Sequence, residues 1–197
     1  NKLLSGIILA LCAAILWGTA GTAQSFAHST ASPFWIGAFR LLFACVLFYV
    51  LFALNRKNNV STAQTAGYKP RILITGCCMA LFNLLFFAGV KITGVAVGSA
   101  TIIGSAPVWA GLIQAVISRK SPIPLWWLGT CCAVAGGFAM TMGKGTALNF
   151  NAGGLLICLS AGFCYAMYSI VSKQLASMAA PLTITTHTFT IAALIAV

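Results

Sequence analysis

Long runs without a charged residue dominate this sequence. Eleven Lys and Arg residues are the only charges in 197 residues. They leave long uncharged runs at residues 3–39, 41–55, 72–90, 92–118, 121–143, 145–172 and 174–197. A helix needs about 20 mostly apolar residues to span a bilayer, and most of these runs reach that length. The chain is therefore expected to be an all-α polytopic membrane protein.

Composition excludes several other classes of protein. The chain is 60% hydrophobic and 6% charged, whereas soluble domains carry roughly 25% charged residues. That balance excludes a soluble enzyme, a disordered tail and a fibrous protein. The formal net charge is +11, but the basic residues stand singly or in pairs between apolar runs, so we expect no nucleic-acid partner.

Acidic residues are absent, and this restricts the chemistry that the chain offers. With no Asp and no Glu, no carboxylate side chain is available for general acid–base work, for a divalent metal or for a proton relay. The eight cysteines lie in apolar runs, and the vicinal pairs at 77–78 and 131–132 lack metal-ligand spacing. We expect packing cysteines, no metal, no cofactor and no enzymatic activity.

Seven helices are predicted from the apolar runs. They cover residues 4–24, 33–54, 71–91, 96–117, 124–142 and 152–172, and the seventh begins near residue 182. Residues 55–70 are expected to form a polar loop. If the amino terminus is cytoplasmic, eight basic residues lie inside and two outside, with Arg40 inside the second helix. The positive-inside rule therefore predicts a cytoplasmic amino terminus, and we expect a multi-pass protein of the cell (inner) membrane.

A weak internal repeat suggests two halves of opposite orientation. A shift of 148 residues places Gly6 on Gly154 and Pro33 on Pro181. Because five helices separate the copies, the second copy is inverted, as in many secondary transporters. We assign residues 1–145 to the first repeat and 150–197 to the start of the second. The partner of the fifth helix would end near residue 290, so about three further helices are expected.

Polar and aromatic residues inside these helices are the candidates for a solute site. Arg40 is the strongest single candidate, because it lies seven residues past Pro33, about 10 Å into the membrane at 1.5 Å per residue. Its counter-charge could be backbone carbonyls, a lipid phosphate, a substrate anion or an acid outside this chain, and a structural role stays open beside contact with a substrate carboxylate. The full candidate set is Trp17, Gln24, Arg40, Asn83, Thr101, Ser105, Tyr165 and Tyr168.

Two further residues have mechanical or structural interpretations. Pro107 interrupts the fourth helix and frees the carbonyl of Ile103, so we expect a kink or hinge there, which either only bends the helix or also lines the substrate cavity. His187 stands alone in the seventh helix and is expected to be a hydrogen-bonded packing residue rather than a proton carrier.

The order of these motifs resembles the EamA-type transporters of the drug/metabolite transporter superfamily. Trp17-Gly18, Pro33 and Arg40-Leu41 carry the resemblance in the first two helices, and Pro107 carries it in the fourth. The segments PLWWLGTCCAVAGG and GGLLICLSAGFCYAMYSIVSKQLASMAAPLTI resemble the fifth helix and the opening of the second repeat. One departure is Ser118-Arg119-Lys120-Ser121, where the family usually has a Glu.

The resemblance implies ten helices and export of small metabolites such as amino acids. The expected mechanism is alternating access, with the solute bound between the repeats. A channel or a non-transporting assembly protein is the alternative, and a membrane enzyme is the least favoured. The expected partners are a small-molecule metabolite and the lipid bilayer, with the protein a monomer or a homodimer.

Overall fold

A computed structural model describes residues 2–26, 33–55, 67–119, 124–142 and 151–197. Within these residues every regular element is a helix, which confirms the predicted all-α fold. The helices are α1 Lys2–Phe26, α2 Pro33–Leu54, α3 Tyr68–Thr93, α4 Val95–Ser118, α5 Pro124–Met142, α6 Ala152–Leu175 and α7 Pro181–Ala196. The chain divides into two compact units, residues 1–31 and 32–197, and each is described by itself.

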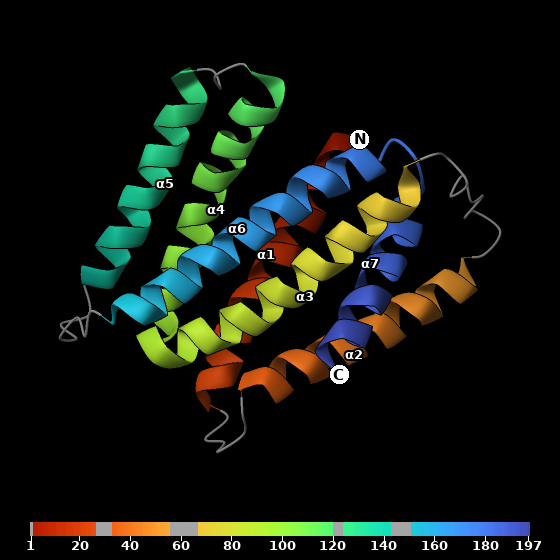
Figure 1. Ribbon diagram of the computed structural model, residues 1–197, viewed down its shortest axis with the longest axis horizontal. Coiled ribbons are helices and arrows are strands. Elements are labelled where there is room, and N and C mark those ends of the chain that lie inside the picture. Colours follow the sequence, from red (N-terminus) through yellow and green to blue (C-terminus); the bar gives the residue numbers. More distant parts are fainter. Residues whose placement is uncertain (1, 27–32, 56–66, 120–123, 143–150) are drawn as a thin grey trace. The chain divides into compact units, whose positions relative to one another are not determined.

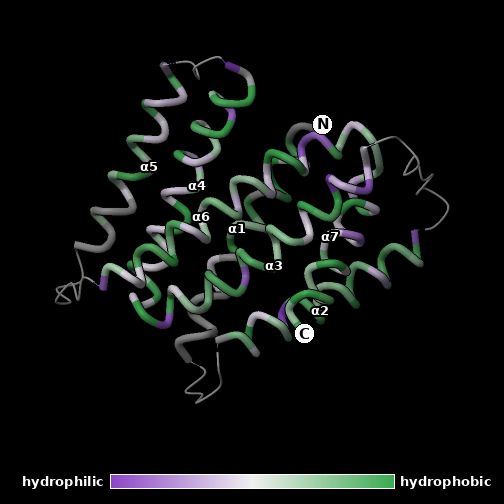
Figure 2. Tube along the Cα trace, viewed as in Figure 1, coloured by the Kyte–Doolittle hydropathy of each residue, from purple (hydrophilic) through white to green (hydrophobic). Residues whose placement is uncertain are grey.

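Four of the described helices are long and apolar enough to cross a membrane. Their apolar stretches are Phe34–Leu54, Tyr68–Thr93, Val95–Ile117 and Ala152–Leu175. Figure 2 shows hydrophobic residues along most of α2, and hydrophilic ones where α4 ends and α6 begins. Large apolar side chains such as Phe43 and Leu54 are exposed, as expected for surfaces that face lipid.

Proline is the first residue of three helices, α2, α5 and α7. Pro33 opens α2 and Pro181 opens α7, because a proline in the first turn has no N–H that the helix needs. The same rule explains a difference from the prediction for α3, which begins at Tyr68 rather than at Arg71. Gly67, at φ 91°, caps this helix, and Pro70 fits inside its first turn. The loop before α3 therefore ends at Gly67 rather than at Pro70 as predicted. Residues 56–66 of this loop lie outside the described part of the chain.

Helix α3 is the centre of the second unit. It packs against α2, α4, α6 and α7, while α6 also packs against α4, and α5 lies beside α4 (Figure 1). Helices α2 and α7 run antiparallel, since Thr186 donates to the Phe48 carbonyl at 3.4 Å and Thr190 lies 3.5 Å from the sulfur of Cys45. A buried cluster of Leu41, Ala80, Ala192 and Ala193 fills the space between α2, α3 and α7.

Glycines allow close approach where several of these helices cross. A methyl group on Gly89 of α3 would lie 2.7 Å from the sulfur of Cys158 on α6. A methyl group on Gly111 of α4 would overlap the indole of Trp126 on α5. By contrast, Gly104 and Gly129 have no described atom within 4 Å of such a methyl group. Close helix packing therefore depends on particular glycines rather than on every small-residue stripe.

Candidate solute-binding site

Arg40 lies near a close approach of α2 to α3. Gly37, one turn earlier on α2, has no side chain, and a methyl group there would lie 3.3 Å from the Phe87 ring and 3.6 Å from the Asn83 carbonyl. This approach brings the Arg40 guanidinium over the ring of Phe87, with its carbon 5.8 Å from the ring centroid. That distance fits a cation–π contact, which stabilises a cation without neutralising it.

The Arg40 guanidinium has no acidic side chain of this chain as a counter-charge. The side chain is half-buried, and within the described part of the chain it makes no hydrogen bond. No acidic side chain exists anywhere in the 197 residues to pair with it. An arginine in an apolar helix that is held by an aromatic face can still offer its N–H donors to an anion, and a carboxylate matches the planar guanidinium in two places.

A continuous row of aromatic rings joins Arg40 to two tyrosines of α6. Phe87 contacts Phe86 with ring centroids 5.4 Å apart, and Phe86 contacts Phe82 at 5.8 Å. Phe82 then contacts Tyr165 on α6 at 5.1 Å, and Tyr165 lies 6.1 Å from Tyr168. We call these six residues, from Arg40 to Tyr168, the aromatic row. The row spans three helices and brings together three of the predicted site residues, Arg40 of α2 and Tyr165 and Tyr168 of α6.

Asn83 belongs to the same stretch of α3. Its side chain is 1% exposed, and Nδ2 donates to the carbonyl of Met79 at 3.0 Å, one turn back on its own helix. Asn83 and Phe87 are four residues apart and therefore share a face of α3, the face that Gly37 approaches. Asn83 is thus close to the Arg40 end of the aromatic row, held by its own backbone.

Thr101 and Ser105 lie elsewhere, on α4. Thr101 donates to the Val97 carbonyl at 2.8 Å and Ser105 to the Ile102 carbonyl at 3.2 Å, so both hydroxyls bond to their own helix. Ser105 also lies against Gly162 of α6. One turn further, Trp109 donates its indole N–H to the Leu159 carbonyl at 3.1 Å and meets Phe163 edge-on. This face of α4 therefore packs on α6, and its part in solute binding stays a prediction.

Several other candidates are placed only in part. Helix α1 contains Trp17 and Gln24, whose side chains lie outside the described residues. Pro107 is half-buried inside a continuous α4, and its role as a hinge stays a prediction. His187 is hydrogen-bonded, as expected, through Nδ1 to the Tyr68 hydroxyl at 2.9 Å.

Metal and disulfide chemistry find no support in the described residues. All eight cysteines are free thiols, and no group of three or more metal-ligating side chains comes together among the residues described. The arrangement instead suits a polar or anionic solute, because it combines one guanidinium, aromatic faces and two phenol groups.

The sequence prediction missed the residues that connect this site. Gly37, Phe82, Phe86 and Phe87 were not among the candidates. A signal for them exists, since Gly37 precedes Arg40 by nearly one helical turn and the three phenylalanines recur at helical spacing. Such spacing is equally typical of ordinary packing, so only the neighbouring helices distinguish the two.

The comparisons with known proteins agree with this description. Residues 4–142 match the model of the EamA-like transporter family, so the chain belongs to that family of polytopic membrane transporters. The chain is also 33% identical over 188 residues to a protein named uncharacterized transporter YwfM from Bacillus subtilis (strain 168). That match covers 95% of this chain and 62% of the relative, so the chain spans about three fifths of the relative's length. No solved structure matches the chain significantly.

Proposed function

We propose that the full-length protein carries small metabolites with a carboxylate group, such as amino acids, across the inner membrane. The main observation in support is the position of the Arg40 guanidinium, which lies over Phe87 and has no acidic partner in this chain. A charge held inside an apolar bundle is costly, and such residues commonly mark a solute or ion pathway. A carboxylate that binds Arg40 would supply the missing counter-charge.

The aromatic row provides the rest of the binding surface. Beside Arg40, the rings of Phe82, Phe86 and Phe87 offer apolar contact for a side chain or carbon skeleton. The phenols of Tyr165 and Tyr168 add hydrogen-bonding groups at the other end. A solute bound along this row would have its carboxylate near α2 and its remaining groups near α6, an arrangement that favours zwitterionic or acidic metabolites over cations.

The transport step that we propose is alternating access, in which the solute site opens to one side of the membrane at a time. Inverted repeats support this mechanism in other transporters. Helices α2 and α7 both begin with a proline, and the 148-residue spacing between Pro33 and Pro181 is the feature of this chain that favours it. We further propose that Pro107 is a hinge in α4. A channel differs by conducting without saturation, and an assembly protein by having no solute.

Counterflow in proteoliposomes tests the proposal. Vesicles that contain the full-length protein are loaded with pools of unlabelled amino acids and related metabolites, and entry of each labelled counterpart is followed. We expect saturable entry of one solute class, reduced at least tenfold by Arg40→Ala, because a charged hydrogen bond contributes about 1.5–3 kcal/mol. Arg40→Lys should retain part of the activity, since it keeps the charge but loses the bidentate geometry.

A second arginine serves as the control. Arg119 is exposed after the end of α4 with φ 51°, a conformation that asparagine adopts readily, so Arg119→Asn should leave entry unchanged. Selective entry that survives Arg40→Ala would make Arg40 structural. Absence of entry for every pool, with folded and inserted protein, would reject carboxylate metabolites as the solutes.

A further inference from the structure

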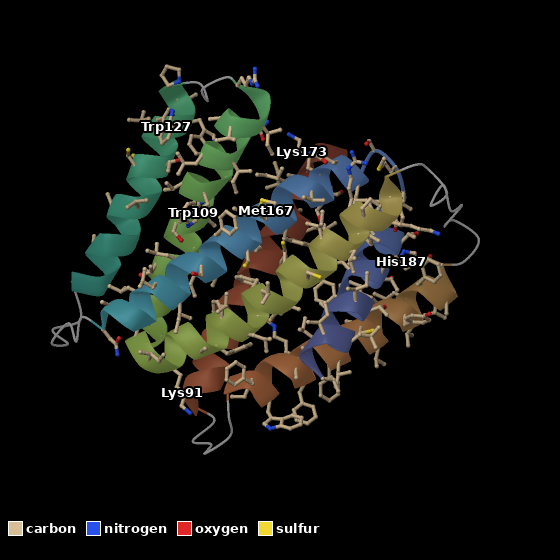
Figure 3. All side chains as sticks on the ribbon, viewed as in Figure 1. Lys91, Trp109, Trp127, Met167, Lys173 and His187 are labelled. Carbon is tan, nitrogen blue, oxygen red and sulfur yellow. The ribbon has the colours of Figure 1, made fainter. Side chains whose placement is uncertain are left out.

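One end of the second unit is closed by side-chain contacts between three helices. Here α3 begins, α6 ends and α7 begins, and Figure 1 shows the turn between α6 and α7 beside the start of α3. Tyr68 of α3 hydrogen-bonds to His187 of α7 at 2.9 Å. Arg71 of α3 donates from Nε to the side-chain oxygen of Gln174 on α6 at 3.2 Å. Figure 3 shows His187 and Lys173 at this end of the unit.

An apolar plug lies beneath these hydrogen bonds. Its buried members come from all three helices and from the turn between α6 and α7, and they are Tyr68, Ile72, Leu175, Ala179 and Ile184, with Met178 and Ile191 packed against them. Arg71 also bonds to the Gly67 carbonyl at 3.2 Å, which holds the guanidinium at the start of its own helix. The hydrogen bonds are therefore placed to hold the plug closed.

The closed arrangement leaves one buried hydroxyl without a partner. Thr183 is 2% exposed, and its Oγ1 has no hydrogen-bond partner among the residues that the structure describes. Threonine in a helix usually bonds to the carbonyl four residues earlier, but for Thr183 that residue is Ala179, which precedes α7. A buried unpaired hydroxyl opposes closure, and it would be hydrated if this end opened.

The opposite end of the α3–α6 pair is built differently. Gly89 of α3 lies against Cys158 of α6, and Gly154 of α6 lies against Ile92 and Thr93 of α3. These contacts involve glycine backbone, so the helices cannot separate there without losing close packing along both chains. At the other end the pair is joined by side chains, namely the apolar plug and the Arg71–Gln174 hydrogen bond, and these contacts can separate while both helices stay intact.

We propose that the turn between α6 and α7, together with the first turn of α3, forms a latch that opens and closes one end of the solute path. The Tyr68–His187 and Arg71–Gln174 hydrogen bonds hold the latch, and the Gly89 and Gly154 contacts are the pivot. The aromatic row lies between them, since Phe82 is 11 residues from Arg71, about 16 Å along α3. Opening the latch would therefore give water access to the row. The path itself rests on the proposed function.

Thiol labelling tests the latch without requiring transport. The full-length protein, with its native cysteines replaced, carries the reporter Ala179→Cys in the plug, where Ala179 is 9% exposed. In nanodiscs both ends of the protein are accessible to a membrane-impermeant maleimide. Tyr68→Phe and His187→Leu should each raise the labelling rate about fivefold, which corresponds to ~1 kcal/mol at 1.4 kcal/mol per tenfold. Tyr49→Phe, at an exposed position of α2, is the matched control and should change nothing.

A double mutant and a second reporter separate the latch from general loosening. Tyr68→Phe with His187→Leu should label no faster than either single variant, because both remove the same bond. His187→Asn, which keeps a polar atom near the Nδ1 position, should restore slow labelling in part. In a second background, the native Cys158, buried at the pivot, is kept as the single cysteine, and it should label slowly in every variant. Unchanged labelling at residue 179, additive effects, or equal increases at residues 158 and 179 would each overturn the proposal.

The same variants distinguish the latch from the proposed function. If labelling responds as expected but no solute pool enters proteoliposomes, the latch stands and the carboxylate-carrier proposal fails. If counterflow is present and sensitive to Arg40→Ala while labelling at residue 179 is unchanged, the function stands and the latch is rejected.

Discussion

At the scale of single residues, polar atoms inside this bundle are bonded in two different ways. Thr101, Ser105 and Asn83 donate to carbonyls of their own helices. These bonds reduce the free-energy cost of burying the polar groups but do not join one helix to another. Trp109 instead donates across a helix boundary, to the Leu159 carbonyl of α6. In a membrane, where apolar contact gives no net drive for helix association, such cross-helix bonds contribute to packing.

Replacement of this indole N–H should therefore be measurable. We expect Trp109→Phe to lower the free energy of unfolding in detergent micelles by about 0.5–1.5 kcal/mol, the usual net value of a hydrogen bond. Trp127→Phe is the control, because Trp127 is exposed and its ring contact with Trp126 can persist. An equal loss in both variants would mean that ring size, rather than the bond to Leu159, sets the stability.

At the scale of elements, α6 is held against its neighbours by glycine. Gly162 of α6 lies against α4. A methyl group added to Gly162 would overlap the Ser105 hydroxyl and approach the Ile102 carbonyl to 3.0 Å. The carbonyl belongs to the backbone and cannot rotate away. Close approach of this kind is what small residues provide in membrane helices.

A methyl group at this crossing should force α4 and α6 apart. We expect Gly162→Ala to cost about 1–3 kcal/mol of stability, as overpacking does in well-packed cores. Gly104→Ala, on the open side of α4, should be neutral or stabilising by about 0.5–1 kcal/mol, because alanine favours helix. Adding Ser105→Ala to Gly162→Ala should recover the side-chain part of the loss. Thermal unfolding of the purified variants decides between these outcomes.

At the scale of the whole molecule, the antiparallel pairing of α3 and α6 places two lysines at opposite ends. Lys91 lies near the end of α3 and Lys173 near the end of α6, and Figure 3 shows them far apart along the pair. Both are exposed. If α3 and α6 each cross the membrane, these two residues face opposite compartments, and the positive-inside rule assigns Lys173 to the cytoplasm.

Site-directed labelling of intact cells checks this orientation. In a background without native cysteines, Lys91→Cys should react with a membrane-impermeant maleimide added outside, whereas Lys173→Cys should react only after the membrane is permeabilised. The reverse pattern would invert the predicted topology, and reaction at both positions in intact cells would argue against two crossings.

The sequence alone determined the helices and their approximate bounds, because the bilayer demands about 20 apolar residues per span and charges mark where each span ends. It also identified Arg40, since one charge inside such a run is exceptional. It extended the loop before α3 to Pro70 because that stretch is polar, although proline is tolerated in the first turn of a helix.

Only the tertiary structure decided which faces meet. Gly37 and Gly104 both stand inside apolar helices in the sequence. In the structure Gly37 of α2 packs against α3, whereas Gly104 of α4 has no described atom within 4 Å of where its Cβ would be. Phe82 and Tyr165 are far apart in the chain, and their contact depends on how α3 and α6 cross. The physical reason is that helix formation follows from local hydrogen bonds and hydropathy, whereas pairing follows from complementary shapes on surfaces that are all apolar. Hydropathy therefore fixes the spans but cannot select their neighbours.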